Sequence, residues 1–419
     1  MWMRILHTAD WHFGKTLEGR DRLPEQAEFV DELCRLCDDE RIDAVLMAGD
    51  VYQTVNPSAQ AEALFYEALH RLADGGRRAV VVIAGNHDNP ERLAAAAPIA
   101  EVVGVTLIGL PKTPISPATG GPGKVARVAG GPSWLELALP GSDAPLVVAA
   151  LPYPSEARLN EVLADGLDEA DLRRGYSERV AAWFRALSRR FRPDTVNIAM
   201  SHLYVQGGLE SDSEIQIQVG GAYAVDPLAF PEDAQYVALG HLHRPQAVAG
   251  SPVPARYSGS PLAYSFSEAG QTKSVVILDA APGRPIQLGQ VALGCGRPLV
   301  RWIAEDGVPQ VIRWVEEGRD AQAWIDLELH LREPLSLQET QMLRSLHPGF
   351  VHIRPVLPEQ EAAAVRATGA LPPDQLFRRF FERRHGAPPD DALVQLFLEL
   401  LAEASAEDDW EALGEEVAG

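Results

Sequence analysis

The chain has few cysteines and no long apolar run. It holds only 3 cysteines in 419 residues, and none of its hydrophobic stretches reaches the length of a membrane-spanning helix. Its first residues enter a strand pattern without the basic and apolar segments of a secretory signal. Internal repeats are also absent. These absences predict a cytoplasmic protein without membrane contact, because structural disulfides belong to oxidising compartments.

Two of the cysteines, Cys34 and Cys37, form a Cys-x-x-Cys pair. A redox pair would open a helix after a strand, whereas this pair lies inside a helical pattern at residues 29–39, and zinc would need a second pair of ligands nearby. We interpret the pair as two small residues on one helix face. Cys295 stands alone and carries no signal.

Positive charge is scarce: 37 Lys and Arg stand against 59 Asp and Glu, and the formal net charge is −22. This balance argues against a nucleic-acid partner, because phosphate contacts favour basic surfaces. The distribution of the acidic residues along the chain weakens this argument against a nucleic-acid partner. Residues 403–419 hold seven acidic residues and no Lys or Arg, which is typical of a solvated tail. Bound cations would also neutralise a carboxylate-lined metal site, so the charge does not exclude a nucleic-acid substrate.

Strand and helix patterns alternate through the first part of the chain. Strand patterns at residues 4–9, 44–48 and 80–84 are separated by helical patterns at 24–40 and 57–73. This order predicts parallel strands joined by right-handed crossovers, and hence an α/β fold. Further strands are expected at residues 146–151, 196–200, 236–239 and 274–279, a helix at 156–191, and a loop with a weak hairpin at 111–131.

A shorter α/β block follows, and it is too short for a large core of its own. We therefore expect it to pack on the first domain. Its elements are strands at residues 299–303, 324–331 and 349–355 and helices at 308–317 and 336–346.

Two amphipathic helices are predicted near the end, at residues 373–384 and 389–404. Each carries an apolar stripe, and two short helices bury too little against each other. Either the stripes pack on the globular body of the same chain, or they bind a separate protein. We favour the separate partner, because exposed apolar stripes usually mark interfaces.

Five short motifs place Asp, Asn or His at the end of an apolar run. They are Asp10-Trp11-His12, Gly49-Asp50, Gly85-Asn86-His87-Asp88, Ser201-His202 and Gly240-His241-Leu242-His243. Short apolar runs that end at a turn are typical of buried strands, and ligands gather beyond the carboxyl ends of such strands in open sheets. Each motif alone is weak. Because all five follow separate strands, together they predict one rim with enough ligands for two metal ions.

The residue types suit a pair of divalent ions about 3.5–4 Å apart, which can clamp the attacking and leaving oxygens of a phosphoryl transfer. Such a pair needs a bridging carboxylate, and Asp50 is the natural candidate. Asp10 and His12 are two residues apart and can reach one ion together. His241 and His243 have the same spacing and can each serve a different ion, whereas Asn86 offers a neutral carbonyl ligand.

His87 directly follows a proposed ligand and should point over the site rather than into it. There it can stabilise the charge that develops on a phosphate or protonate the leaving alkoxide. We expect Asp88 to orient its imidazole, since a working histidine usually has such a partner. The other histidines, including His7, are interpreted as structural or surface residues.

The order of these motifs resembles the calcineurin-like metallophosphoesterase superfamily, and finer features resemble its branch of SbcD-type nuclease subunits. The features are the stretches at residues 4–14 (RILHTADWHFG), 48–52 (AGDVY), 238–244 (ALGHLHR) and 257–261 (YSGSP). The resemblance covers about residues 3–280. It implies an α/β sandwich of two mixed sheets flanked by helices, with a small α/β capping domain and a terminal helical hairpin. The expected divisions are residues 1–296 for the nuclease domain, 297–357 for the capping domain, 358–404 for the partner-binding hairpin and 405–419 for an acidic tail.

The same resemblance implies ligands, metal and partners. One ion would be held by Asp10, His12, Asp50 and His243, and the other by Asp50, Asn86, His202 and His241. The family prefers manganese and works as a homodimer with SbcC, a coiled-coil ATPase, on double-stranded DNA ends and hairpins. Partner contact would fall on the terminal helices. Because the chain has no Gly-x-x-x-x-Gly-Lys-Ser/Thr motif, ATP chemistry would come from that partner.

The sequence departs from some relatives at Gln53 and Thr54, where they place a histidine or an aspartate, so the role of this loop stays open. The leading hypothesis is a DNA exo- and endonuclease subunit that acts in DNA repair. The main alternative is a phosphoesterase of the same fold that acts on small nucleotides or phosphoproteins, because fold does not imply function. A third hypothesis is a scaffold protein with a vestigial metal site. The complete set of candidate ligands argues against this hypothesis.

Overall fold

The computed structural model describes residues 2–155, 175–214 and 224–357, together with 375, 377–378, 381–382, 389–391 and 393–398. The chain divides into two compact units. The first comprises Met1–Trp302, Asp320–Asp326 and Gly349–His352, and the second comprises Ile303–Arg319, Leu327–Pro348 and Ile353–Gly419. Among the described residues, no helix combines the length and apolar character needed to cross a bilayer.

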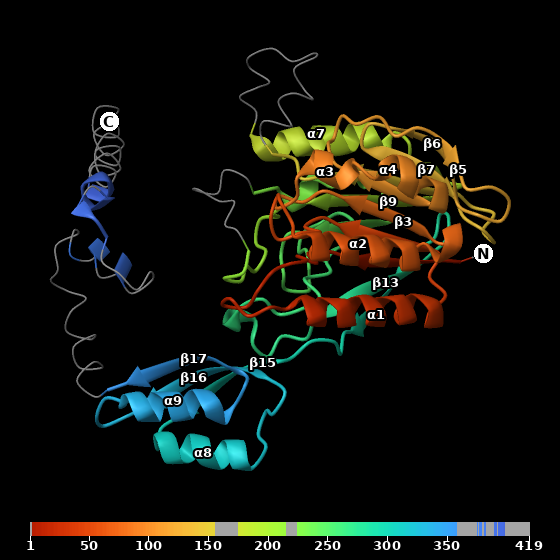
Figure 1. Cartoon of the computed structure of the whole chain (residues 1–419). Helices are drawn as coiled ribbons and strands as arrows, with labels where there is room; N and C mark the ends of the chain where they lie inside the picture. The colour runs from red at the N-terminus through yellow and green to blue at the C-terminus, as the bar shows by residue number, and fades with distance from the viewer. Residues whose placement is uncertain are drawn as a thin grey trace, which may run out of the picture. The chain divides into compact units, whose positions relative to one another are not determined.

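The first sheet of the larger unit confirms the predicted β-α-β-α-β order (Figure 1). Its six strands run in the order β14-β13-β1-β2-β3-β4. Strands β1 to β4 are parallel, and β13 pairs antiparallel with both β1 and β14. The strands are β1 (Met3–Thr8), β2 (Ala44–Ala48), β3 (Ala79–Ile83), β4 (Val105–Ile108), β13 (Ser274–Ala280) and β14 (Gln287–Ala292). The crossover helices α1 (Leu23–Asp39) and α2 (Ala59–Leu72) lie side by side along this sheet.

The second sheet has eight strands in the order β11-β12-β10-β9-β8-β7-β6-β5. Its central strands β8, β9, β10 and β12 are parallel, whereas β5 to β7 form antiparallel hairpins that lead into β8. The strands are β5 (Ala118–Thr119), β6 (Ala126–Gly131), β7 (Trp134–Ala138), β8 (Leu146–Leu151), β9 (Val196–His202), β10 (Tyr236–Gly240), β11 (Gln246–Ala247) and β12 (Ala255–Tyr257).

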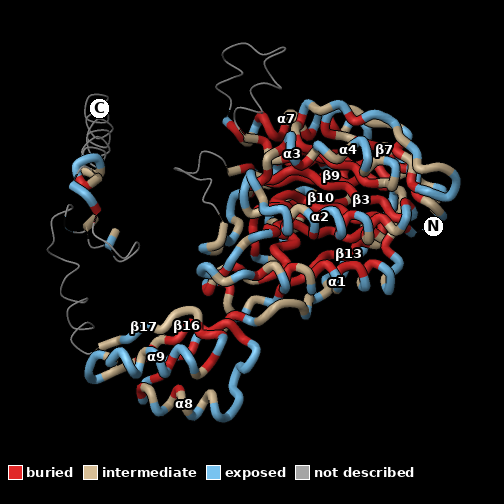
Figure 2. The backbone as a smooth tube through the Cα atoms, viewed as in Figure 1, coloured by how far each residue is buried: buried red, intermediate tan, exposed pale blue. Residues whose placement is uncertain are grey.

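The central strands are mostly apolar, as expected for strands whose two faces are both covered. Ile5 and Leu46 of the first sheet share one core with Ile198 of the second. On the outer face of the first sheet, Val45 and its neighbours pack against Phe29 of α1 and Phe65 of α2. The outer face of the second sheet packs against α7 (Tyr176–Ser188). Figure 2 shows these strands buried and the outward sides of the helices exposed. The expected sandwich of two mixed sheets flanked by helices is therefore present.

The short α/β block has its predicted elements. Its sheet has the order β15 (Leu299–Ala304), β16 (Trp324–His330) and β17 (Phe350–Val356), and its helices are α8 (Val308–Glu316) and α9 (Leu337–Leu346). A capping box begins α9: the Ser336 side chain accepts from the Glu339 backbone N–H, and the Glu339 carboxylate accepts from the Ser336 backbone N–H. Short helices elsewhere in the chain are α3 (Pro90–Ala94), α4 (Ala97–Ala100), η1 (Asp74–Gly76), η2 (Glu101–Val103), η3 (Pro227–Ala229) and η4 (Phe266–Glu268).

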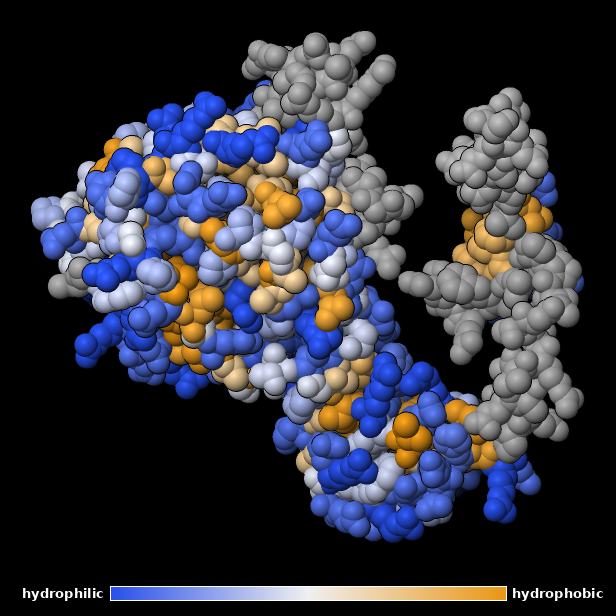
Figure 3. Space-filling view, turned by 180° about the vertical axis from the view of Figure 1, so that it is seen from behind, coloured by the Kyte–Doolittle hydropathy of each residue, from blue (hydrophilic) through white to orange (hydrophobic). Residues whose placement is uncertain are grey.

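The two terminal helices of the prediction fall only partly on described residues. Residues described as helical occur in both predicted segments, and the ring of Phe377 stacks on that of Phe397 with centroids 4.3 Å apart and planes 9° apart. The two segments therefore contact each other. Hydrophobic residues are visible on the surface of their described part (Figure 3), and Leu396 is 50% exposed. The rest of the predicted hairpin, the acidic tail at 405–419 and the part of the predicted 156–191 helix before residue 175 lie outside the described residues.

Candidate metal centre

The five motifs follow strands that are neighbours in the two sheets. Asp10, Asp50 and Asn86 come shortly after the parallel neighbours β1, β2 and β3. His202 is the last residue of β9, and His241 follows β10, its parallel neighbour in the second sheet. Parallel neighbours end at the same edge of a sheet, so the fold brings the ends of both sheets to one place.

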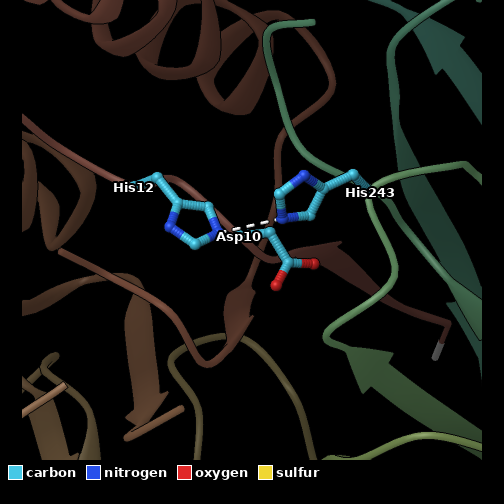
Figure 4. Close-up of side chains that lie close together, drawn as sticks. All are labelled: Asp10, His12 and His243. Atoms are coloured by element: carbon cyan, nitrogen blue, oxygen red, sulfur yellow. Dashed lines mark hydrogen bonds between the residues drawn. The ribbon is translucent and has the colours of Figure 1, made fainter. Parts of the chain in front are cut away.

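A first group of donor atoms comes from the first and last motifs. The Nε2 atoms of His12 and His243 lie 2.9 Å apart, and a carboxylate oxygen of Asp10 lies within 4.8 Å of a nitrogen of each. Figure 4 shows the three side chains converging from two loops, one that carries Asp10 and His12 and one that carries His243. Two nitrogens bound at right angles to one ion, each at about 2.1 Å, would be about 3 Å apart. The observed spacing therefore fits two ligands of one ion.

A second group surrounds the amide of Asn86. Its Oδ1 atom lies 2.8 Å from Nε2 of His202 and 3.2 Å from Nδ1 of His241. Nδ1 of His202 lies 2.9 Å from the carbonyl oxygen of Ala48, to which it donates, and this bond fixes the orientation of the ring.

Asp50 lies between the two groups. Its Oδ2 atom is 3.5 Å from Nε2 of His12, in the first group, and 3.4 Å from Nε2 of His202, in the second. The side chain is buried, and its other oxygen, Oδ1, accepts the backbone N–H of His87 at 2.9 Å. One carboxylate oxygen is thus within reach of both donor groups, as a bridging ligand requires.

The protonation states suit a cation site. Burial lowers the pKa of His12, His243 and His241, in the last case to about 3, so these imidazoles are neutral and keep a lone pair for a metal. Burial and the charge of Asp50 raise the pKa of Asp10 well above its usual value, although His202 opposes the shift. Two buried carboxylates that repel each other beside neutral imidazoles form a donor set that a divalent cation fits.

Asp50 and His202 form an ion pair at the centre of this cluster. Burial disfavours the charge on each, but their mutual attraction prevails. The pKa of Asp50 is therefore held well below its usual value, and that of His202 rises to about 9. Without a metal ion, the positive charge of protonated His202 stabilises the Asp50 carboxylate. A divalent cation at this place would stabilise the carboxylate more strongly, because it carries a larger charge.

Four of the nine described non-glycine residues with positive φ belong to the candidate site. Asp10, His12, Asp50 and His241 have φ angles of 55°, 48°, 54° and 107°, a region that non-glycine residues rarely adopt. Such conformations cost free energy and persist where the surrounding structure enforces them, often at functional sites.

Two motif glycines are required by close approach of the loops. A Cβ atom on Gly240 would lie 1.8 Å from the carbonyl oxygen of Ala48, and one on Gly85 would lie 2.0 Å from Oδ1 of Asp50. Neither position has room for any side chain. The glycines of the motifs therefore let the ligand loops pack directly against one another.

The structure contradicts the role expected for Asp88. Its carboxylate accepts the backbone N–H groups of Val51, Tyr52 and Gly85 at 3.1, 3.0 and 2.8 Å, so it joins two ligand loops rather than orienting an imidazole. Burial and the charge of Asp50 nonetheless raise its pKa to about 6.

The partner of His87 is a backbone carbonyl. Its Nδ1 atom lies 2.8 Å from the carbonyl oxygen of Gln53, to which it donates, and its Nε2 atom lies 3.9 Å from Oδ2 of Asp50. The ring of His87 also packs edge-on against that of His12, with centroids 4.7 Å apart. The sequence left the role of the Gln53 loop open. In the structure this loop orients His87 through the backbone carbonyl oxygen of Gln53, an atom that every residue type has.

Other residues hold the first motif in place, and sequence reasoning missed them. Gln26 of α1 donates to the carbonyl oxygen of His12 at 3.1 Å. The hydroxyl of Tyr264 donates to the carbonyl oxygen of Trp11 at 2.5 Å. Because these bonds end on backbone atoms, no motif marks them.

His7, Cys34 and Cys37, which the sequence analysis interpreted as structural residues, are buried in the core. His7 is buried between the hydroxyl of Tyr236 and the carbonyl oxygen of Leu239, and burial lowers its pKa to about 3. Cys34 and Cys37 are buried free thiols of α1, and burial raises the pKa of Cys37 to about 12. Neither cysteine is a thiolate near neutral pH.

Comparison with known proteins places this geometry in a family. Residues 3–245 match the family model described as calcineurin-like phosphoesterase. The chain is 52% identical over 408 residues to the D subunit of nuclease SbcCD from Bacillus subtilis (strain 168), covering 97% of this chain and 100% of that protein. The chain belongs to the SbcD branch of the calcineurin-like metallophosphoesterases. It is a metal-dependent nuclease.

Further comparisons agree with this placement. The SbcD-type chain is 37% identical over 298 residues to the D subunit of nuclease SbcCD from Rhodobacter capsulatus, covering 67% of each. Residues 295–385 match the family model described as Type 5 capsule protein repressor C-terminal domain. A solved dimetal phosphatase from Danio rerio is similar to 70% of this chain and 99% of its own, at 11% identity and a TM-score of 0.37, too distant to support any argument.

Proposed function

We propose that this SbcD-type nuclease hydrolyses phosphodiester bonds at double-stranded DNA ends and hairpins by a two-metal mechanism, and that it acts in DNA repair. The observation that carries the proposal is the position of Asp50 Oδ2, 3.5 Å from the His12 nitrogen of one donor group and 3.4 Å from the His202 nitrogen of the other. The proposed ligands of the first ion are Asp10, His12, Asp50 and His243, and those of the second are Asp50, Asn86, His202 and His241.

In this proposal, two bound divalent ions supply Lewis-acid stabilisation of the phosphate and lower the pKa of an attacking water. Asp50 would contribute its carboxylate to holding both ions, because its Oδ2 atom lies within reach of both donor groups. His87 is proposed to act on the substrate rather than on a metal, because its Nδ1–H is donated to the Gln53 carbonyl and its Nε2 stays available. When the ring also carries a proton on Nε2, this second N–H can protonate the leaving oxygen or donate a hydrogen bond to the phosphate.

We propose manganese as the metal. Two carboxylates, one amide oxygen and four imidazoles form a mixed oxygen and nitrogen set that manganese accepts, and geometry and availability then select the metal. Calorimetric titration of metal-free protein with Mn²⁺, Mg²⁺ and Zn²⁺ tests this choice. Two Mn²⁺ bound per chain with cleavage restored would support it, whereas cleavage restored by Mg²⁺ or Zn²⁺ alone would reject it.

The proposed partner is an SbcC-type coiled-coil ATPase, which would bind the hairpin at residues 358–404. The names of the relatives point to such a complex for those proteins. Two observations on this chain support the proposal: the rings of Phe377 and Phe397 stack, joining the two segments, and Leu396 beside them is half exposed. The proposed domain limits remain 1–296, 297–357, 358–404 and 405–419, and the second family match begins close to the first of these limits, at residue 295.

A homodimer is also proposed. Light scattering on the purified full chain measures it directly, and a mass twice the 45.5 kDa of one chain would support it. A mass of one chain at the concentrations used for cleavage would reject it.

The decisive experiment compares two substrates with manganese present. Labelled linear duplex DNA and the small ester bis-p-nitrophenyl phosphate are incubated with the same preparation. Cleavage of the duplex supports the proposal. Hydrolysis of the small ester without DNA cleavage would favour the phosphoesterase alternative, and no hydrolysis of either, despite two bound ions, would favour a vestigial site.

A further inference from the structure

A loop between β9 and β10 contributes a hydroxyl to the first donor group. The Ser213 Oγ atom lies 2.5 Å from Nδ1 of His243, on the opposite side of the ring from the Nε2 atom that faces His12. The same hydroxyl donates to Oε1 of Glu268 at 2.6 Å. Ser213 therefore connects a proposed metal ligand to a carboxylate 55 residues away in the sequence.

Glu268 is buried and fully engaged. Its Oε1 atom also accepts the backbone N–H of Tyr264 at 3.1 Å, and its Oε2 atom accepts from the ammonium of Lys273. The ammonium makes further bonds to the carbonyl oxygen of His243 at 2.9 Å and to the hydroxyl of Ser260 at 3.1 Å. The backbone N–H of Tyr264 and the ammonium of Lys273 can only donate, so both oxygens of Glu268 act as acceptors.

These contacts fix which group donates and which accepts in the hydrogen bonds that link His243, Ser213 and Glu268. Because Glu268 only accepts, the Ser213 hydroxyl must give its one proton to it. The Ser213 oxygen is then left as an acceptor for Nδ1–H of His243. Neighbouring Ser211 does not compete for this role, since its own hydroxyl donates to Oε2 of Glu214 at 2.6 Å. With the proton on Nδ1, the lone pair of His243 lies on Nε2 and faces the proposed ion.

We propose that Ser213 is a positioning residue that, with Glu268 and Lys273 behind it, holds His243 in the tautomer and orientation needed to bind metal. The inference rests on the proposed metal centre and adds a residue to it. Hydrogen bonds of this kind to a ligating imidazole orient the ring and raise its basicity. The chemistry served is coordination of a divalent cation at the group formed by Asp10, His12 and His243.

The loop that carries Ser213 is also tied to the site by its backbone and by the side chain of Glu214. Lys15 donates to the carbonyl oxygen of Ser213 at 2.8 Å, and Glu214 accepts the backbone N–H of His243 at 2.7 Å. The backbone N–H of Asp212 donates to the hydroxyl of Ser267 at 3.0 Å. These bonds do not use the Ser213 side chain, so removing its hydroxyl should leave the loop in place.

The test compares three full-length variants with the unaltered protein. Ser213→Ala removes the hydroxyl, and Ser213→Thr keeps it. Ser211→Ala is the matched control. Its hydroxyl lies 3.0 Å from Oγ of Ser213, but it donates to Glu214 and makes no hydrogen bond to His243 in the described structure. Metal-free protein is titrated with Mn²⁺ by calorimetry, and thermal unfolding is recorded for each variant to show that it folds.

We expect Ser213→Ala to weaken binding of one of two Mn²⁺ ions by about 10- to 100-fold, the usual effect of losing such a partner. Ser213→Thr should recover the affinity, and Ser211→Ala should keep it. Unchanged binding in Ser213→Ala, or an equal loss in Ser211→Ala, would overturn the assignment. If the unaltered protein binds no Mn²⁺, the proposed metal centre itself fails, and this outcome is distinct from the others.

A second measurement depends on no variant of Ser213. Nitrogen-15 NMR of labelled histidine in the metal-free protein reports which ring nitrogen carries the proton, and His243→Gln identifies the signal. We expect His243 to be protonated on Nδ1. Protonation on Nε2 alone would overturn the proposal, because the lone pair would then face Ser213 instead of the ion.

Discussion

Replacing Gly85 by alanine should disable the proposed metal centre without replacing any of the proposed ligands. A Cβ atom at this position would lie 2.0 Å from Oδ1 and 2.3 Å from the backbone nitrogen of Asp50, whereas real Cβ contacts essentially never fall below 3.0 Å. The contact with Oδ1 is about 1 Å shorter than this 3.0 Å limit. To remove the clash, the Gly85 and Asp50 loops must therefore move apart by at least about 1 Å. Because one of the clashing atoms belongs to the backbone, a change of rotamer in Asp50 cannot provide it. The proposed bridging ligand must move.

The size of the effect follows from that displacement. Misplacing a reacting group by about 1 Å can cost about 100-fold in rate, so we expect duplex cleavage by Gly85→Ala to fall by a factor of this order. Overpacking of a dense site costs about 1–3 kcal/mol of stability. Urea unfolding should show this smaller loss, with a folded protein remaining. Binding of both Mn²⁺ ions should weaken, since Asp50 is proposed to serve both.

Gly175→Ala is the matched control, because a Cβ atom there meets nothing within 4 Å. It should keep cleavage, Mn²⁺ binding and stability close to those of the unaltered protein. If Gly85→Ala cleaves duplex DNA and binds Mn²⁺ at unaltered levels, the close packing of this loop on Asp50 does not position the ligand, and the reasoning is refuted.

Four further substitutions or deletions test separate parts of the site. Asp50→Asn should abolish cleavage and weaken both ions in a Mn²⁺ titration; full activity would remove Asp50 from the bridging position. His87→Gln should keep both Mn²⁺ ions and lose turnover on duplex DNA, whereas loss of bound metal would make His87 a ligand. Asp88→Asn should lower the free energy of unfolding in urea by about 1–3 kcal/mol, since its NH2 group cannot accept from a buried backbone N–H; an unchanged midpoint would contradict this. Deletion of residues 373–419 should spare cleavage of short DNA but abolish capture of the SbcC-type ATPase, and an unchanged pull-down would place the contact elsewhere.

The strands that carry the site could be predicted because their burial is recorded in their composition. Residues 44–48 are apolar without interruption, and the structure buries all of them between a second sheet and the helices. The outer hairpins were harder to predict. The strand Ala126–Gly131 contains two glycines and has only its second residue fully buried, so it has neither an apolar run nor a clear alternation. Pairing with β7, and not local preference, makes it a strand.

The residues of the candidate site could be predicted only where the side chain itself is the proposed donor. All the predicted ligands are brought to the ends of the two sheets, because each lies at or just beyond the end of an apolar strand. The partner of His87 could not be predicted, since the atom involved is the carbonyl oxygen of Gln53, which any residue offers. Ser213 was missed for a different reason. It lies 30 residues before His243 in a polar loop, and only the folded chain places its hydroxyl against that ring.

The contacts of Asp88 show what the other residues of the motif Gly-Asn-His-Asp do in this chain, although only Asn86 is a proposed ligand. Asp50 accepts the N–H of His87, while Asp88 accepts N–H groups of Val51 and Tyr52, so each loop supplies a carboxylate to the backbone of the other. Gly85 allows the approach that these bonds require. The two loops are therefore one rigid unit whose geometry sets the distance between Asp50 and Asn86. It follows that the motif specifies a backbone arrangement as much as a set of ligands, and that changes at its non-ligand positions should impair metal binding through Asp50.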